Sequence, residues 1–292
     1  MFSFRTIALT AAFFANGVAH ANEAHERTPQ ESDVVVEGTR PALKQQVQTF
    51  VSALVHRAWG DESLVRWRTP ICPLVAGIAR EQGEAVLLTI SQVARNAGAP
   101  LAASDCKRPN FLVIVTADPA DLLQRWLKRD PRLLNGKGTA AMRRFENMPG
   151  PVLPLYNASV VCAATGRAAS PGSRIGAVET SSCVNEDSRL KWNSLNVLDS
   201  VIVMVDARAV RNVRLGHLAD YIATVGLVEL DLDRSVGDDI PTVLHLFSRD
   251  NTAAQGISSF DRAFLKAAYD TTQRSKLQRW LIVDQMVEQL DR

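Results

Sequence analysis

The chain has 292 residues, of which 46% are hydrophobic and 22% are charged, so it can fill the core of one large domain or two small ones. The formal net charge is only +2, which gives no strong field to attract nucleic acid or an anionic membrane surface. Basic residues do not cluster with aromatic ones either, and the composition therefore argues against a nucleic-acid-binding protein.

The first 21 residues are typical of a secretory signal peptide. Arg5 supplies a positive charge, residues 6–18 form a short apolar run, and Ala19-His20-Ala21 places small residues where a signal peptidase cleaves. The run is shorter than the roughly 20 apolar residues that span a bilayer. We therefore expect cleavage after Ala21 and an exported protein, periplasmic or secreted, with no membrane span.

Residues 22–33 are polar and charged, which predicts a disordered leader before one α/β domain that covers residues 34–292. Within that domain, residues 34–60 should form a short strand and a helix. The helix is expected from Pro41 to Trp59, because its apolar residues recur at helical spacing and form one stripe. Such a stripe covers a core, or it docks on a partner and makes the protein an envelope assembly subunit.

Strands and helices alternate in the next part of the chain. Ile71 to Gly77 is a short apolar run that predicts a strand, and a helix is expected from Ala79 to Gly98. Phe111 to Thr116 predicts a strand buried on both faces, and Asp118 is placed to cap the helix that follows. This order predicts a mixed, mostly parallel sheet flanked by helices, which is an α/β (α+β) fold.

The middle of the chain gives weaker signals. Residues 132–148 are partly helical in pattern, Ala158 to Ala163 predicts a strand, and residues 166–187 predict a long loop. Residues 189–197 alternate polar and apolar side chains, which is typical of an edge strand, whereas Val201 to Val205 predicts a separate buried strand. An edge strand could accept an extended peptide by strand addition.

Four cysteines in an exported chain favour disulfides, and no C-x-x-C spacing points to zinc instead. Three pairings are possible. Cys72 and Cys106 fall at the starts of neighbouring predicted strands, while Cys162 and Cys183 enclose a single excursion of the chain. We therefore expect the pairs 72–106 and 162–183, each contributing roughly 3 kcal/mol by restricting the unfolded chain.

The C-terminal third is predicted to be mainly helical. Helices are expected at residues 215–230, 258–269 and 275–290, with an apolar turn segment from Pro241 to Phe247 after the first of them. In the last helix Trp280 shares a face at helical spacing with three aliphatic residues, Val283, Val287 and Leu290.

This order of elements, together with the residues around Gly226, resembles the metzincin metalloproteases. In that family the corresponding helix carries H-E-x-x-H-x-x-G-x-x-H, in which three histidines bind zinc and the glutamate polarises the zinc-bound water. Gly226 aligns with the family glycine. The four other motif positions, which in the family hold His, Glu, His and His, are then occupied by Ala219, Asp220, Ala223 and Glu229.

A second resemblance lies downstream. Metzincins have a tight turn of the type Ser-Ile-Met and then a capped helix of the type L-S-x-x-D-x-x-A-I-x-x-L-Y. The corresponding residues here are 241–244, followed by Ser258, Asp261 and Tyr269. Taken without the resemblance, Ser258 and Asp261 also predict a helix cap with an acidic first turn.

The resemblance implies a zincin/metzincin-like core over residues 70–271, followed by a C-terminal helix in residues 272–292. A similar R-W-x-x-P-[IV] start, here residues 66–71, occurs in uncharacterised exported bacterial proteins with the same ending. Alanine has no donor atom for a metal, so the resemblance implies a pseudoenzyme, a non-catalytic binding or structural protein without a cofactor, whose partner would be a peptide or an envelope protein. The alternative is a zinc-dependent hydrolase with an atypical metal site built from His245, Asp220 and Glu229.

Overall fold

The computed structural model describes residues 39–55, 63–103, 105–134, 138–147, 150–169, 174–175, 178–179, 183, 190–248, 256–273 and 275–292. These residues belong to one compact unit, Glu37–Arg292. The predicted signal peptide, the predicted leader and the predicted short strand near residue 34 lie outside the described residues, as does the segment 56–60 at the end of the first predicted helix.

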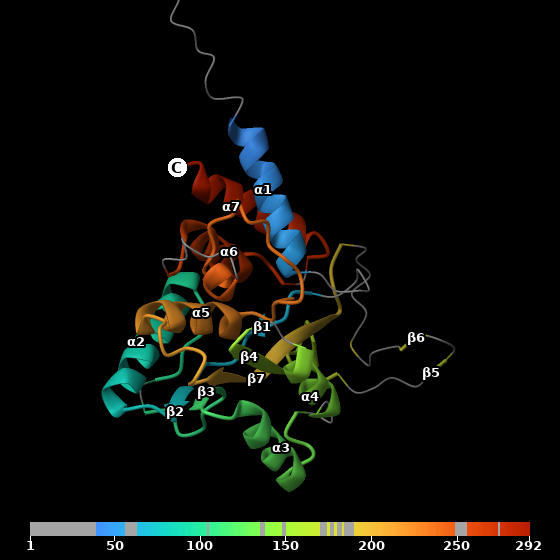
Figure 1. Cartoon of the computed structure of the whole chain (residues 1–292). Helices are drawn as coiled ribbons and strands as arrows, with labels where there is room; N and C mark the ends of the chain where they lie inside the picture. Colours follow the sequence, from blue (N-terminus) through green and yellow to red (C-terminus); the bar gives the residue numbers. More distant parts are fainter. Residues whose placement is uncertain are drawn as a thin grey trace, which may run out of the picture. The chain divides into compact units, whose positions relative to one another are not determined.

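A mixed, mostly parallel sheet forms the centre of the fold (Figure 1). Its longest strand, β7 (Ser194–Asp206), pairs in parallel with β1 (Arg66–Trp67) and with β3 (Phe111–Thr116). Strand β2 (Pro73–Ala76) continues the sheet in parallel beside β3, and β4 (Val152–Cys162) is antiparallel to β7 on the opposite side. The predicted sheet type is therefore confirmed.

The predicted edge strand at residues 189–197 is not a separate strand, and from Val197 onward it does not lie at an edge. Residues 194–197 are the first part of β7, which continues into the predicted buried strand 201–205 as one element. Along its whole length β7 is paired with β4, and from Val197 onward it is also paired on its other side with β1 and then β3. From Val197 onward β7 lies inside the sheet, and before it the N–H and the carbonyl of Asn196 are bonded to Ser63 Oγ and Gln273 Nε2, so strand addition of a peptide is not favoured here.

Polar side chains also lie in the middle of β7, between the two strands that the sequence predicts. These side chains face polar partners on β4: Asn157 Nδ2 donates to Ser200 Oγ at 3.0 Å, and Ser159 Oγ donates to Asp199 Oδ1 at 2.9 Å. The pairing register of β4 shifts between Asn157 and Ala158, at the same place. A β-bulge lined by polar pairs therefore lies between the two predicted strands, which the structure joins into one.

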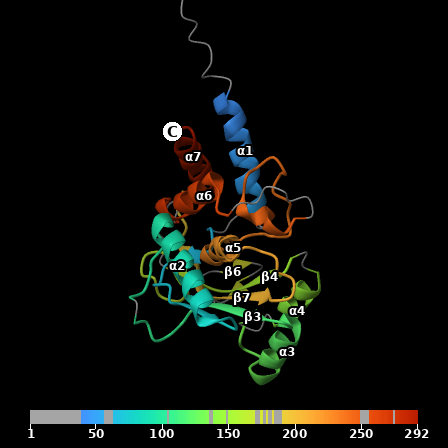
Figure 2. The same cartoon turned by 60° about the vertical axis from the view of Figure 1, so that its left-hand side comes forward.

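Helices cover both faces of the sheet. Helices α2 (Arg80–Ala97) and α5 (Leu215–Leu227) contribute to a large core with Val201, Val203 and Val205 of β7, whereas α3 (Pro119–Arg129) and α4 (Gly138–Asn147) pack with the alternate residues of β7 in a smaller core. The two views show α2 and α5 on one side of the sheet and α3 and α4 on the other (Figures 1 and 2). Successive β7 side chains thus supply opposite layers.

Local signals placed α2 and α3 correctly. Helix α2 ends at Gly98, which adopts the left-handed conformation with φ 81° that glycine accommodates at a helix end. Helix α3 begins after Asp118, whose side chain accepts the backbone N–H of Asp121 at 3.0 Å, and Pro119 occupies its first turn. Both caps were predicted from adjacent residues alone.

The apolar stripe of α1 (Thr39–Leu54) is buried against the same chain. Phe50 is fully buried and meets the rings of Phe260 and Phe264 edge-on, each at 5.8 Å between centroids. Those two rings belong to α6 (Ser259–Asp270), and α1 also packs beside α7 (Gln278–Leu290). The stripe is therefore not available to dock on a partner.

Both predicted disulfides, Cys72–Cys106 and Cys162–Cys183, are formed. Such bonds persist in oxidising compartments, which agrees with an exported protein. Within the described parts of the chain, no helix has the length and apolarity required to cross a bilayer.

Other boundaries differ from the predictions. Strand β4 begins at Val152, six positions before the predicted strand, and α5 ends at Leu227 instead of Leu230. The predicted loop 166–187 contains a short antiparallel pair, β5 (Arg174–Ile175) and β6 (Val178–Glu179). The predicted turn segment is a 3₁₀ helix, η1 (Val243–Phe247).

Candidate functional site

The two helical positions at which metzincins have histidines are part of the core. Ala219 and Ala223 are exposed by only 1% and 0%, and both belong to the large hydrophobic cluster on the α2 side of the sheet. Helix α5 packs closely against α2 along this region. An imidazole at either position would have to displace core side chains, so the small residues serve close packing.

Gly226 serves the packing of a pair of aromatic rings. It is the second-last residue of α5, and its carbonyl accepts the indole N–H of Trp67 at 2.9 Å. The indole of Trp67 stacks on the ring of Phe111, with 6.3 Å between centroids and 11° between planes. A Cβ atom on residue 226 would overlap the Phe111 ring. Because Gly226 is helical and lies outside the left-handed region, it does not bend the chain as the family glycine does.

Asp220 anchors a turn. Its Oδ2 accepts the backbone N–H of Ile257 at 3.0 Å, immediately before α6. The neighbouring Gly256 has φ 76°, and a Cβ there would lie 2.6 Å from the same carboxylate oxygen. The half-buried carboxylate of Asp220 therefore fixes the backbone of residues 256 and 257, just before α6.

His245 and Glu229 are also held by structural contacts. His245 lies in η1 and its Nε2 donates to the carbonyl of Val236 at 2.8 Å, which places the proton on Nε2. Glu229 follows α5, and its backbone N–H donates to Val65 at 3.0 Å. The structure does not bring His245, Asp220 and Glu229 together, and in the described ranges no group of three or more His, Cys, Asp or Glu is arranged to hold a metal ion.

The helix cap predicted at Ser258 is confirmed. Ser258 Oγ accepts the backbone N–H of Asp261 at 3.0 Å, and the Asp261 carboxylate accepts the backbone N–H of Ser258 at 2.9 Å. The same carboxylate also binds Thr242 and Val243, so it joins the cap of α6 to the start of η1. This second set of contacts had no signal in the sequence.

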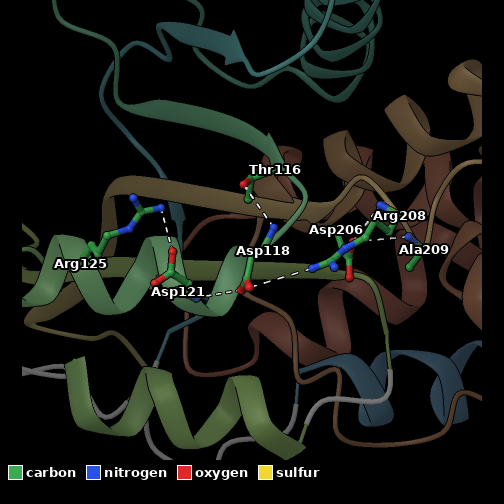
Figure 3. Close-up of polar contacts among 7 residues, drawn as sticks. All are labelled: Thr116, Asp118, Asp121, Arg125, Asp206, Arg208 and Ala209. Carbon is green, nitrogen blue, oxygen red and sulfur yellow. Dashed lines mark hydrogen bonds and ion pairs between the residues drawn. The ribbon is translucent and has the colours of Figure 1, made fainter.

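A polar cluster lies at the carboxyl ends of β3 and β7 (Figure 3). Thr116 and Asp206 end these strands and are register partners. From this edge the chain continues into α3 on one face of the sheet and into α5 on the other. Open α/β sheets commonly bind ligands at such a switch point.

The carboxylates of this cluster are engaged in local contacts. Asp118 caps α3, and Asp206 accepts the backbone N–H of Arg208 at 2.8 Å. The Arg208 guanidinium lies 4.0 Å from both Asp118 and Asp206, and Asp121 pairs with Arg125 at 2.8 Å (Figure 3). These contacts fix the turns that follow β3 and β7, so we assign the cluster a structural role.

A cavity of about 780 Å³ lies beside α1 and α7. These two helices run side by side in both views (Figures 1 and 2), and residues 63–65 also contribute to the wall. We call this cavity the two-tryptophan groove, and its lining includes Gln48, Ser52, Trp192, Glu229, Asp231, Asp233, Lys276, Leu277, Arg279 and Trp280.

Trp280 is exposed by 54%, whereas Val283 and Val287 are buried, so the predicted common face of the last helix is divided. The buried side of α7 combines the two valines with Ile282 and Met286, which are one helical turn apart. Periodicity alone did not reveal that the indole borders a cavity.

Further apolar and cationic groups surround the groove. Leu277 and Leu190 are exposed by 51% and 61%, and Lys276 places its ammonium 4.9 Å from the ring centroid of Trp192. The backbone N–H of Lys276 donates to the Leu190 carbonyl at 2.9 Å, which holds these segments together. An exposed apolar patch next to a cavity is typical of a binding surface.

Alkaline pH is expected to weaken the fold through a buried tyrosine of α5. Burial raises the pKa of Tyr221 to about 12, so the native state keeps its proton when the unfolded state, with a pKa near 10, loses it. Its stability contribution is complete below pH 10 and is lost as the pH rises through the native pKa. Urea denaturation at pH 9 and pH 11 should therefore show a loss of about 1.4 kcal/mol from this residue.

The variant Tyr221→Phe is the control for this alkaline effect. It keeps the edge-on ring contact with Phe247, at 5.0 Å between centroids, but it cannot ionise. Burial also raises the pKa of Tyr269, which donates to the Leu227 carbonyl at 2.6 Å, so part of the alkaline loss should remain in the variant. An equal loss in both proteins would contradict the assignment to Tyr221.

No protein-family model, curated protein or solved structure matches this chain. The candidate site is therefore identified from the geometry of the structure. Of the places described above, the α5 motif positions are filled by core packing and the carboxyl edge of the sheet is engaged in caps, whereas the two-tryptophan groove offers a cavity with exposed aromatic surface.

Proposed function

We propose that the protein is an exported, non-catalytic binding protein built on a metzincin-like scaffold, and that its ligand binds in the two-tryptophan groove. The observation that carries the proposal is the burial of Ala219 and Ala223, the positions at which the family binds zinc. Methyl groups packed in a core supply neither a ligand atom nor space for a metal-bound water.

The order of the elements supports the scaffold part of the proposal. A strand–helix–strand unit, β2–α2–β3, is followed by the antiparallel strand β4, the central strand β7 and the helix α5. The turn η1 and the capped helix α6 then follow in the order expected from the resemblance. The role of Gly226 departs from the family, because here the residue accommodates an aromatic ring.

The composition of the groove supports the binding part of the proposal. Aromatic side chains with both an apolar face and a polar edge are enriched at binding surfaces. Trp192 and Trp280 both line the cavity, and carboxylates from the segment after α5 lie on the same lining. The groove thus combines apolar and polar groups, as ligand sites do.

The metal content of the protein tests the non-catalytic part. The mature protein is purified without chelators and is dialysed first against zinc and then against buffer. Elemental analysis is then expected to find well below one zinc ion per chain. The physical reason is that the alanine positions offer no donor atoms and that His245 Nε2 is bound to a carbonyl. His245→Ala should leave the metal content unchanged.

Retention of one transition-metal ion per chain, with its loss in the variant His245→Ala, would instead establish the atypical hydrolase site. That result would remove the non-catalytic part of the proposal. It would leave the groove to be examined separately, because neither Trp192 nor Trp280 belongs to the alternative metal site.

A further inference from the structure

We propose that the two-tryptophan groove binds a neutral, hydroxyl-rich oligosaccharide. This inference rests on the proposed binding function and adds the chemical class of the ligand. Five features of the groove support it, namely its aromatic surfaces, its polar side chains, its balance of charge, its backbone hydrogen bonds and its size.

The aromatic surfaces fit the rings of sugars. Trp280 exposes 54% of its surface beside the cavity, and Trp192 contributes a second indole to the same lining. A flat indole packs well against the C–H face of a pyranose ring and leaves the equatorial hydroxyls free at the rim, because aromatic rings combine an apolar face with a polar edge. Trp280 is the exposed stacking surface, while Trp192 lies beneath Lys276, packs on a small apolar cluster and adds apolar surface to the lining.

The polar side chains fit hydroxyl groups. Gln48 and Ser52 of α1 face the cavity from one wall, and Asp231 and Asp233 contribute carboxylates. Asp231 also pairs with Arg234 at 3.4 Å, which orients its carboxylate. A hydroxyl group can donate to a carboxylate and accept from an amide, so a polyol satisfies both kinds of side chain at once.

The charges of the groove favour a neutral ligand. Its acidic residues are Glu229, Asp231 and Asp233, and its basic residues are Lys276 and Arg279. The two cations are also engaged, since Lys276 lies over the Trp192 ring and Arg279 donates to the Val55 carbonyl at 3.1 Å. Three acidic groups against two basic ones create no positive field for an anionic polymer.

Three backbone groups of residues 64 and 65, in the wall of the groove, are already hydrogen-bonded within the chain. The N–H of Leu64 donates to Gln278 Oε1 at 2.9 Å, and the Leu64 carbonyl accepts from Gln273 Nε2 at 2.7 Å. The Val65 carbonyl accepts the N–H of Glu229 at 3.0 Å. Because these groups are paired within the chain, strand addition is not favoured, and recognition must proceed through side chains.

The size of the cavity agrees with an oligosaccharide. Its volume of about 780 Å³ lies within the range of roughly 300–1,000 Å³ that is usual for sites of small ligands. Leu277, exposed by 51% at the start of α7, extends the apolar surface beyond Trp280. A short chain of sugar rings could therefore stack on Trp280 and reach the polar wall.

The test begins with a glycan array that displays neutral and anionic oligosaccharides, probed with the mature chain. Isothermal titration calorimetry then measures the tetramers of β-1,4-linked N-acetylglucosamine and α-1,4-linked glucose and the strongest array ligand. We expect a neutral oligosaccharide to bind with a Kd below about 1 mM. Trp280→Ala should weaken binding about tenfold or more.

Two further variants control for folding and for non-specific apolar contact. Trp280→Phe keeps an aromatic ring and should retain part of the affinity, while Leu88→Ala removes another exposed apolar side chain, 60% exposed on α2, and should change nothing. The free energy of unfolding of Trp280→Ala should lie within about 0.5 kcal/mol of that of the natural chain, because the indole that it removes is half exposed.

The outcomes separate this inference from the proposed function. If no neutral oligosaccharide binds but selected peptides from a display library bind and lose affinity in Trp280→Ala, the sugar inference is overturned and the groove remains a binding site. Preferential binding of anionic glycans also overturns it. If Trp280→Ala alters neither glycan nor peptide binding, the groove itself is not the binding site.

Discussion

Replacing Gly226 by alanine is expected to lower the free energy of unfolding by about 3 kcal/mol or more, although it adds a single methyl group. The added Cβ would lie well inside 3.0 Å of three ring carbons of Phe111. The ring cannot move away freely, because Phe111 is fully buried and stacked on Trp67. The backbone cannot move either without stretching the 2.9 Å bond from Trp67 Nε1 to the Gly226 carbonyl.

The same helix supplies a matched control. Gly216 lies near the start of α5, and a Cβ added there would have nothing within 4 Å. Gly216→Ala should therefore be neutral or stabilise the protein by up to about 1 kcal/mol, because alanine has the higher helix propensity. Urea denaturation of both variants measures the difference.

A double-mutant cycle identifies the collision as the cause. In a Phe111→Ala background the ring is absent, and the added methyl of Gly226→Ala should cost far less than in the natural chain. The packing explanation of this glycine is wrong if the free energy of unfolding of Gly226→Ala stays within about 0.5 kcal/mol of that of the natural protein. It is also wrong if the loss of stability is the same in the Phe111→Ala background.

Elements that depend on neighbouring residues could be predicted from the sequence. The strand Phe111–Thr116, the cap at Asp118 and the glycine that ends α2 follow from short runs of residues and from backbone preferences, and the structure confirms them. Both disulfides were also predicted, because the expected strand order brought Cys72 near Cys106 and left Cys162 and Cys183 at the ends of one excursion.

The interior position of β7 could not be predicted, because it depends on partners far away in the sequence. Val197 and Val201 pair with Arg66 and Phe111, about 130 and 90 residues earlier, and such pairings leave no local trace in the sequence. Ser194 and Asn196 are half-exposed and alternate with the buried Leu195 and Val197, and a strand inside the sheet with one polar face shows the same alternation as an edge strand. The alternation of polar and apolar residues alone therefore predicts an edge strand.

The candidate site shows the same limit. The lack of donor atoms at Ala219 and Ala223 was evident from the sequence, whereas their burial required the packing of α5 against α2. The two-tryptophan groove was missed because α1, Trp192, the segment after α5 and α7 each contribute only a few side chains. The one residue that could have indicated the groove is Trp280, but its helical spacing to Val283 and Val287 predicts that it is buried on the same face.

Asp261→Ala is expected to cost about 4 kcal/mol, because the side chain is 1% exposed and joins two elements. Its carboxylate accepts the hydroxyl of Thr242 at 2.5 Å, the N–H of Val243 at 2.8 Å and the N–H of Ser258 at 2.9 Å. Alanine would leave these donors without their acceptor in a buried place. Each buried donor that loses its partner costs about 1–3 kcal/mol.

Two comparisons show that the loss comes from the buried acceptor and not from removal of a charge in α6. Asp270→Ala changes the same residue type at the other end of the helix, where the carboxylate is exposed and pairs with Lys266, and should cost less than about 1 kcal/mol. Asp261→Asn keeps one carbonyl oxygen for the backbone donors and should fall between the two alanine variants. Equal losses for Asp261→Ala and Asp270→Ala in urea denaturation would show that the link between η1 and α6 contributes little, and the turn before α6 would then depend mainly on the bond between Asp220 and Ile257.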